Sequence, residues 1–411
     1  MPISQIVTNS IANNAVTAAK LASDAFSAQI FKPSITSPAN NATEILDTQL
    51  FTATTYLSLY GRSQANANWQ ISTSPTFAFI NVDSTITGSN TQFQANASSG
   101  LVANTIHYAR VRYSDDANNS SDYSNTVQFT TNTAFPFIVN FLVVAGGGGA
   151  GGTIGSAPYA SAGGGAGGYR SSVPGFSSGA NSPAESATPA FVSTNYTVTV
   201  GAGGAISTRG SNSVFGSVSS RGGGAGSPAS GGTDIDGGSG GGGGDPVGTG
   251  GMAAGTGVSG QGTSGGSAPG SQGTSGGGGG AGAAGSGNQG GNGLDSPITG
   301  TSVTRGGGGS GLSGSTAPGG SGGGGASGVP GGPAGPATAG TPNTGGGGGG
   351  ARGPSSGEQA GKTGGSGTVI LRYPNTRTIS NPGGGLTFTT SANGSNTVAI
   401  FTAGTGSVSW S

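Results

Sequence analysis

Glycine is concentrated in one block of this chain, from Gly146 to Gly367, and this block limits the possible folds more than any other feature. Of the 93 glycines, 84 fall within it and make up more than a third of its residues. That amount is typical of collagen, but no strict three-residue glycine register persists, which excludes a collagen triple helix. A block so poor in apolar side chains is either disordered or held together by its backbone.

An ordered block would use polyproline II geometry, which has three residues per turn and no hydrogen bonds within the helix. Its N–H and C=O groups point outward and can pair with neighbouring helices, and glycine lets those helices pack backbone to backbone. Three strand-like segments, residues 141–147, 195–204 and 367–374, predict a small sheet that clamps both ends of the block. Since a disordered linker needs no such strands, we expect a polyglycine II helix bundle on a small β-sheet base.

The composition excludes several classes of function. With 13 basic and 13 acidic residues the net charge is zero, so no basic surface predicts binding to nucleic acid or anionic lipid. The chain has no Cys and a single His, His107, which excludes thiolate chemistry, disulfides and the common zinc sites. The N-terminus does not resemble a secretory signal, and the apolar segment 135–145 is about half the length that spans a bilayer. We expect a buried strand at 135–145, with no membrane insertion, no cofactor and no metal site.

Two segments precede the glycine block. Residues 1–31 place apolar side chains at three- and four-residue steps, and the stretch 7–21 resembles repeats of trimeric bacteriophage tail fibres. This resemblance implies a segment for attachment to other tail proteins and for assembly of a homotrimer; a frayed helix is the alternative. Residues 32–132 carry short β-branched and aromatic runs separated by Asn, Asp, Ser and Gly, which is the pattern of an all-β sandwich.

The second of these segments resembles a fibronectin type III domain. The resemblance rests on the opening residues 33–38, on Trp69, on the strand 108–112 and on residues 121–124 before the last strand. It implies a seven-stranded spacer or protein-contact module without an active site. The strand spacing matches loosely over residues 77–101, so another immunoglobulin-like topology stays open.

The glycine block itself closely resembles the glycine-rich domain of bacteriophage tail-fibre and adhesin proteins over residues 138–374, within a domain expected at 136–374. The motifs include LVVAGGGGAGG, GGGAGGYR, YTVTVGAGG and the closing GGSGTVILRY. The resemblance implies a receptor-binding protein of the virion tail fibre, in which polyglycine II helices pack into a sandwich. Loops at its tip would contact a bacterial outer-membrane protein or a lipopolysaccharide glycan. The insert 174–193 departs from the family pattern, and its position relative to the tip is open.

The few large side chains between the glycine runs are the candidate receptor-binding residues. Aromatic and long apolar side chains supply rigid contact area at small entropic cost, and they stack on sugars or pack on protein loops. We therefore predict that the receptor is contacted by five loop residues: Tyr159, Phe176, Phe191, Met252 and Leu294. The alternative for Tyr169, Phe191 and Phe215 is that they cover the base sheet.

The sequence contains no convincing catalytic constellation. Residues 262–266 fit the nucleophile-elbow pattern, but the pattern recurs at 273–277 and lacks a preceding strand and a downstream His. A glycan hydrolase needs paired acids, and the acids of the block are scattered. Asp234 and Asp236 could ligate Ca²⁺, yet two carboxylates without a full loop motif make a weak site, and His107 is expected to be structural. We therefore expect that the chain is not an enzyme.

The tail, residues 375–411, returns to alternation at 386–390 and 396–401, and the dipeptide Asn393-Gly394 between them is a hairpin signal. We expect a C-terminal β-hairpin unit; a receptor-contacting patch around Trp410 is the alternative.

Together these observations predict a phage receptor-binding protein with an attachment segment, a fibronectin-like β-sandwich and a glycine-rich adhesin domain. A structural or ice-binding polyglycine II protein is one alternative, and it would show flat, regular faces rather than variable loops. A surface-glycan hydrolase is another. The N-terminal repeat indicates a trimer, whereas a polyglycine bundle can fold within one chain.

Overall fold

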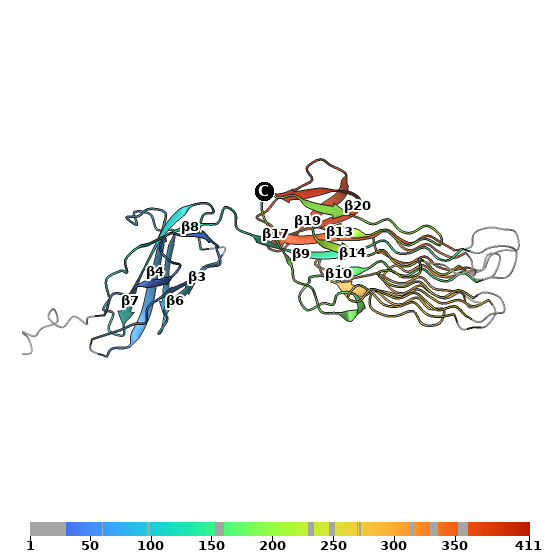
Figure 1. Ribbon diagram of the computed structural model, residues 1–411, viewed down its shortest axis with the longest axis horizontal. Helices are drawn as coiled ribbons and strands as arrows, with labels where there is room; N and C mark the ends of the chain where they lie inside the picture. Colours follow the sequence, from blue (N-terminus) through green and yellow to red (C-terminus); the bar gives the residue numbers. More distant parts are fainter. Residues whose placement is uncertain are drawn as a thin grey trace, which may run out of the picture. The chain divides into compact units, whose positions relative to one another are not determined.

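Strands dominate the structure, and they fall into two units, Met1–Phe135 and Pro136–Ser411 (Figure 1). A single 3-10 turn, Gly179–Asn181, is the only helical element in the part of the chain that is described, which confirms the all-β prediction. No helix there is long and apolar enough to cross a bilayer. The predicted attachment segment lies almost entirely outside the described residues. The computed structural model describes residues 30–411 except for 60, 97–98, 153–159, 229–233, 246–250, 269, 271–272, 313–315, 329–335 and 352–360.

Two sheets make up the first unit. All neighbouring strands in them are antiparallel except β2 and β8, which are parallel. The smaller sheet has the order β1 (Ile35–Ser37), β3 (Leu50–Ala53), β6 (Gln92–Gln94). The larger sheet has the order β2 (Ala42–Ile45), β8 (Val127–Thr131), β7 (Ile106–Asp115), β4 (Gln64–Ser72), β5 (Val82–Thr87).

Side chains of both sheets form one core. Burial alternates along β7 because successive side chains of a strand point to opposite faces. Phe51 of the smaller sheet packs against Trp69 and Phe129 of the larger one, with ring centroids 6.2 and 5.4 Å apart. The buried Tyr113 of β7 donates its hydroxyl hydrogen to the carbonyl oxygen of Thr54 at 2.5 Å, which ties the two sheets together.

His107 makes the stability of this unit depend on pH. The ring is buried and stacks on Phe129 at 5.5 Å; its Nε2 lies 3.2 Å from the Val102 carbonyl oxygen, and its Nδ1 has no partner among the described residues. Burial lowers the pKa of His107 below 6.5, so the fold holds the ring neutral while the unfolded chain takes up a proton. The contribution of His107 to the free energy of unfolding is therefore complete above its pKa in the unfolded chain. It is lost as the pH falls from that value toward the pKa of His107 in the folded protein, by at most about 1.4 kcal/mol per pH unit.

We expect chemical unfolding of the first unit, followed at several values between about pH 7 and pH 5, to show this slope in the wild type. The slope should disappear in His107→Gln, since the chain has no other histidine. An identical slope in the variant would show that another group titrates in this range.

The second unit contains a ten-stranded sheet, whose strands come from both the beginning and the end of the unit's sequence. Seven of its strands follow the order β10-β9-β17-β20-β12-β13-β14, while β11 pairs with β9, and β18 and β19 pair with β20. The bounds are β9 (Phe137–Val144), β10 (Tyr169–Ser171), β11 (Thr188–Ala190), β12 (Tyr196–Thr199), β13 (Ser213–Phe215), β14 (Val218–Ser220), β17 (Thr368–Pro374), β18 (Ile379–Ser380), β19 (Leu386–Asn393) and β20 (Asn396–Trp410).

This sheet is larger than the base expected from the sequence. The predicted buried strand is β9, and it runs antiparallel to β17 with Leu142 opposite Ile370. The predicted strand within residues 195–204 is β12, and it pairs with neither β9 nor β17, because β20 lies between β17 and β12 and pairs with both. The sheet also curls, since the Ser220 hydroxyl of β14 donates to the Val143 carbonyl oxygen of β9 at 2.8 Å. The result is a barrel-like sheet rather than a small clamp.

The tail completes this sheet. Strands β19 and β20 form the hairpin predicted at Asn393-Gly394. Trp410, in β20, is only 1% exposed, and its ring centroid lies 5.4, 5.5 and 5.6 Å from those of Phe137, Tyr196 and Tyr373. The alternative of a receptor-contacting patch around Trp410 is therefore wrong, because the side chain fills the core.

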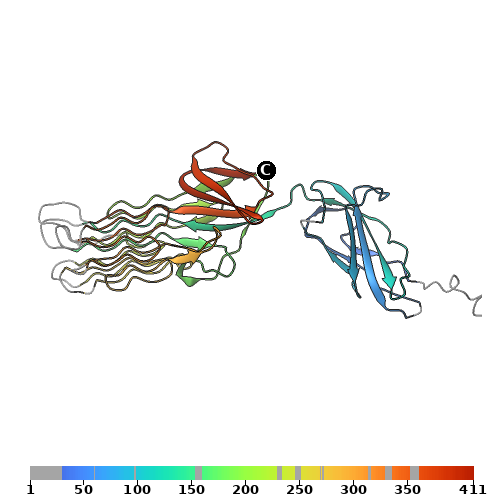
Figure 2. The ribbon, with the colours of Figure 1, turned by 180° about the vertical axis from the view of Figure 1, so that it is seen from behind.

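The glycine runs extend from the sheet as segments that lie side by side (Figures 1 and 2). Backbone hydrogen bonds join them into what we call the glycine lattice, residues 145–367. In segment 163–168, successive N–H groups donate to three different neighbours, and each neighbour recurs after three residues. The N···O distances are 2.8–3.0 Å, and the donor–acceptor pairs are Gly163–Gly276, Gly164–Gly348, Gly165–Gly224, Ala166–Gly279, Gly167–Gly345 and Gly168–Arg221.

Carbonyl groups of the same segment accept from three further neighbours. The donors are Gly148, Gly242 and Gly309, whose N···O distances to the segment are 2.8, 2.9 and 2.9 Å. Segment 163–168 is therefore surrounded by six others. All six of its N–H groups and five of its six carbonyl oxygens are hydrogen-bonded to these neighbours, without a side-chain core.

Close packing explains why the lattice needs glycine. A Cβ atom at Gly164 would lie 2.1 Å from the carbonyl oxygen of Gly148, and one at Gly347 would lie 1.9 Å from that of Gly164. Both contacts are with backbone that is itself hydrogen-bonded. The glycine content here reflects steric exclusion rather than flexibility.

Buried serines add to the hydrogen bonding of the lattice. The Ser161 hydroxyl donates to the Ala351 carbonyl oxygen at 3.0 Å and accepts from the Ala351 N–H at 2.8 Å. The Ser310 hydroxyl donates to the Ala317 carbonyl oxygen and accepts from the Ser327 N–H, both at 2.7 Å. Each hydroxyl thus serves as donor and acceptor at once toward neighbouring segments.

Candidate functional site

Two of the five predicted receptor-binding residues, Met252 and Phe191, lie in different parts of the second unit. Tyr159 is outside the described residues. Met252 lies in the lattice, with its Sδ atom 3.7 Å from the Ser227 hydroxyl oxygen. Phe191 follows β11, and its N–H donates to the Tyr196 hydroxyl at 2.9 Å. No contact among the described residues joins Met252 to Phe191.

Phe176 and Leu294, in contrast, line one hollow of about 390 Å³, which we call the Phe176 hollow. It is formed by the insert, by the lattice and by a two-stranded sheet of β15 (Leu294–Ser296) and β16 (Val303–Arg305). The lining residues are Gly175, Phe176, Ser177, Gly293, Leu294, Asp295, Thr304 and Ser321.

A turn in the insert presents the aromatic ring. A proline followed by Gly175 at φ +79° is the pattern of a type II turn, and the Phe176 N–H donates to the Val173 carbonyl oxygen at 3.2 Å. Val173 is buried and anchors the turn, while Phe176 stays 40% exposed. The Glu185 N–H donates to the Ser171 carbonyl oxygen of β10 at 2.8 Å, so the insert, whose position the sequence left open, lies beside the sheet.

Polar groups complete the lining of the hollow. Asp295 and Thr304 face each other across the β15–β16 pair, and the Thr304 hydroxyl donates to Oδ1 of Asp295 at 2.5 Å. Oδ2 of Asp295 has no partner within the described ranges. Ser177 and Ser321 add two more hydroxyls, and none of the described lining residues is Lys or Arg. The hollow thus offers an aromatic ring, one carboxylate and three hydroxyls.

Sequence reasoning missed Asp295 and Thr304, because their approach depends on the register of β15 and β16. The available signal was the turn between the two strands, where the Gly300 N–H donates to the Pro297 carbonyl oxygen at 2.9 Å. A hairpin around that turn would have placed the two polar side chains on one face.

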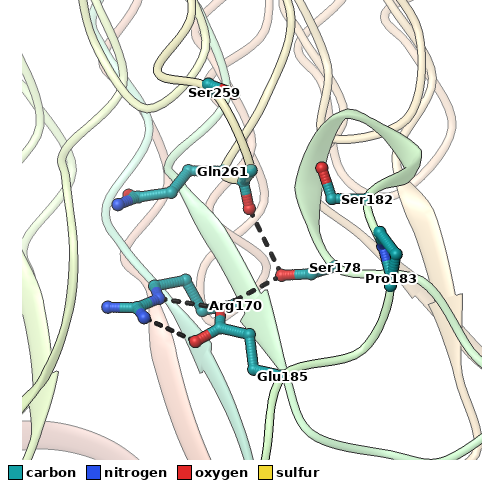
Figure 3. A pocket seen from close by; sticks show the side chains of 8 residues that line it. Arg170, Ser178, Ser182, Pro183, Glu185, Ser259 and Gln261 are labelled. Atoms are coloured by element: carbon teal, nitrogen blue, oxygen red, sulfur yellow. Dashed lines mark hydrogen bonds and ion pairs between the residues drawn. The ribbon is translucent and has the colours of Figure 1, made fainter.

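A second hollow, of about 340 Å³, is lined by the next residues of the insert (Figure 3). Arg170 of β10 forms a two-pronged ion pair with Glu185, in which Nε lies 2.8 Å from Oε1, and its Nη1 donates to the Ser219 carbonyl oxygen at 3.2 Å. The Ser178 hydroxyl lies 3.3 Å from the same carboxylate. Because these groups satisfy one another, we interpret this hollow as the joint between the insert and β10.

The two aspartates considered as calcium ligands are engaged elsewhere. Asp234 pairs with Arg209 at 3.0 Å, and Asp236 accepts from the N–H and the hydroxyl of Thr256 at 2.6 and 2.9 Å. These hydrogen bonds from Thr256 hold the pKa of Asp236 below its usual range. Within the described ranges, no group of three or more His, Cys, Asp or Glu side chains could hold a metal ion.

Comparison with solved structures gives a match to the alpha-L-rhamnosidase of Streptomyces avermitilis complexed with L-rhamnose. It covers 43% of this chain and 17% of the rhamnosidase, at 11% identity and a TM-score of 0.20. The expectation that the chain is not an enzyme stands against this distant match to a glycosidase, and we do not retain it. At this TM-score the similarity assigns no activity to the chain.

Comparison with curated proteins gives no match. The family model described as a glycine-rich domain, however, matches residues 121–374, which is more than half of the chain and includes the whole lattice. The density of glycine, the strands that enclose the lattice and this match agree. The chain belongs to the glycine-rich domain family.

Proposed function

We propose that this protein is a receptor-binding protein of a bacteriophage tail fibre, which attaches the virion to a bacterial surface through its glycine-rich unit. The observation that carries the proposal is the glycine lattice. Its three-residue periodicity of hydrogen bonding toward six neighbours is what packed polyglycine II helices would make. Such a lattice is a rigid scaffold for the segments that connect its helices, and the sequence resemblance to phage adhesins assigns recognition to those segments.

The remaining parts have roles in the same proposal. The two sheets and shared core of the first unit support a fibronectin-like spacer. Residues 1–31 would bind other tail proteins and assemble a homotrimer. The receptor is an outer-membrane protein or a lipopolysaccharide glycan, contacted by residues of the set Tyr159, Phe176, Phe191, Met252 and Leu294.

The test is attachment to cells. Fluorescently labelled protein should bind saturably to at least one strain of a panel of bacteria, and unlabelled protein should block phage adsorption to that strain. Protease treatment of the cells should abolish binding to a protein receptor, and periodate treatment should abolish binding to a glycan. The matched control is the same protein after irreversible heat unfolding. No saturable binding to any strain would contradict the proposal.

A second candidate is a structural or ice-binding polyglycine II protein, and the regularity of the lattice favours it. Thermal hysteresis of the purified protein, together with absence of cell binding, would select this candidate.

A further inference from the structure

We propose that the Phe176 hollow is a saccharide subsite that accepts one neutral pyranose ring. The inference rests on the proposed function for the source of the ligand, which is a bacterial surface glycan. It assigns the chemistry of recognition to a place beside the sheet, on the insert that departs from the family pattern.

The first argument is the exposed ring. Phe176 keeps 40% of its surface in solvent although the residues that anchor its turn are buried. An aromatic face exposed at the wall of a hollow is suited to stack on the C–H face of a pyranose. Leu294 extends this apolar surface and packs against the buried cluster that includes Tyr169 and Ile298, so its position is fixed.

The second argument is the polar lining. A sugar hydroxyl both donates and accepts, so it needs acceptors and hydroxyls in reach. Asp295 supplies a free Oδ2 acceptor, while its Oδ1 is held by Thr304. Ser177 and Ser321 supply hydroxyls that can act in either direction.

The charge of the lining and the volume of the hollow limit the class of ligand that it can bind. Because the described lining residues include one carboxylate and no Lys or Arg, a phosphate or an acidic sugar would be repelled. The volume of about 390 Å³ lies at the small end of the range for ligand sites, roughly 300–1,000 Å³, which fits one ring rather than a long chain. A neutral pyranose satisfies both conditions.

The site is also preorganised. The turn at Gly175 fixes the backbone that carries Phe176, and the hydrogen bond from Thr304 fixes the Asp295 carboxylate, so little backbone entropy is lost when a ligand binds.

The experiment is ligand-observed saturation-transfer NMR on the full chain. The probes are the methyl α-pyranosides of D-glucose, D-galactose and D-mannose, with N-acetylneuraminic acid as the charged comparison. We expect saturation transfer to at least one neutral pyranoside, and affinity for it that falls about tenfold in Phe176→Ala, because one stacking contact is worth about 1.4 kcal/mol. Asp295→Asn should weaken it several-fold. The matched control is Phe79→Ala, which removes an exposed ring of the first unit and should change nothing.

Saturation transfer to none of the neutral pyranosides, preference for the acidic sugar, or unchanged affinity in Phe176→Ala would each overturn the inference. The proposed function is tested separately by cell attachment. If Phe176→Ala attached to cells as the wild type does, the subsite alone would be contradicted. If the wild type did not attach to cells, the proposed function would be contradicted, and sugar binding would be decided by the NMR experiment.

Discussion

Gly164→Ala is expected to destabilise the second unit by about 3 kcal/mol or more, a large part of the stability of a typical domain. The added Cβ atom would lie 2.1 Å from the Gly148 carbonyl oxygen, which is far inside van der Waals contact. To remove this clash, segment 163–168 would have to move away from segment 145–151, and that movement would break hydrogen bonds to several neighbours at once. Chemical unfolding followed by circular dichroism should show an earlier transition of the second unit and an unchanged transition of the first.

The matched control is Gly152→Ala. Its added Cβ atom would meet the Ser207 hydroxyl oxygen at 3.0 Å and a methyl group of Ile206 at 3.5 Å, both of which belong to side chains that can shift. We expect a cost below about 1 kcal/mol. Equal and small effects of the two substitutions would show that the glycine segments are not packed backbone to backbone.

The order of the glycine block could be predicted from the strands that enclose it. Residues 137–144 and 368–374 are apolar and β-branched, and each had to find a partner because an unpaired apolar strand leaves backbone groups unsatisfied. The hairpin at Asn393-Gly394 was equally accessible, since this dipeptide favours the turn that a two-residue loop needs. Local signals of this kind depend on neighbouring residues only.

The pairing inside the lattice could not be predicted. Three of the six segments bonded to segment 163–168, those that contain Gly276, Gly309 and Gly348, are more than a hundred residues away, and all six are glycine runs. Backbone groups are the same in every residue, so no side chain tells one run from another. The position of β20 between β17 and β12 was missed for a related reason. The alternating apolar and polar residues of β20 are equally compatible with a hairpin that stands apart from the sheet.

The candidate site divides in the same way. Phe176 could be chosen from its residue type, since a large ring in a segment of small residues marks a contact surface. That it shares a hollow with Leu294 follows from the fold, because the two residues are separated by most of the lattice sequence. The five residues were therefore chosen by residue type alone. Which of them share a hollow depends on the turn at Gly175 and on the register of β15 with β16.

Trp410→Ala is expected to destabilise the second unit by about 3–5 kcal/mol, the usual cost of removing a buried tryptophan. The side chain is buried among Phe137, Tyr196 and Tyr373, which belong to three other strands, so its removal leaves a cavity where those strands meet. Trp410→Phe should cost less, because Nε1 has no partner in the described part of the chain and only volume is lost.

The other tryptophan, Trp69, provides the control because it is buried in the core of the first unit. Trp69→Ala should lower the transition of the first unit by a similar amount and leave that of the second unit in place. Each variant also leaves one tryptophan, so fluorescence then reports mainly on the unit that keeps its core. If Trp410→Ala left the second transition within about 1 kcal/mol of the wild type, the tail would not be part of the sheet core, and the lattice would draw its stability from its own hydrogen bonds rather than from the strands that enclose it.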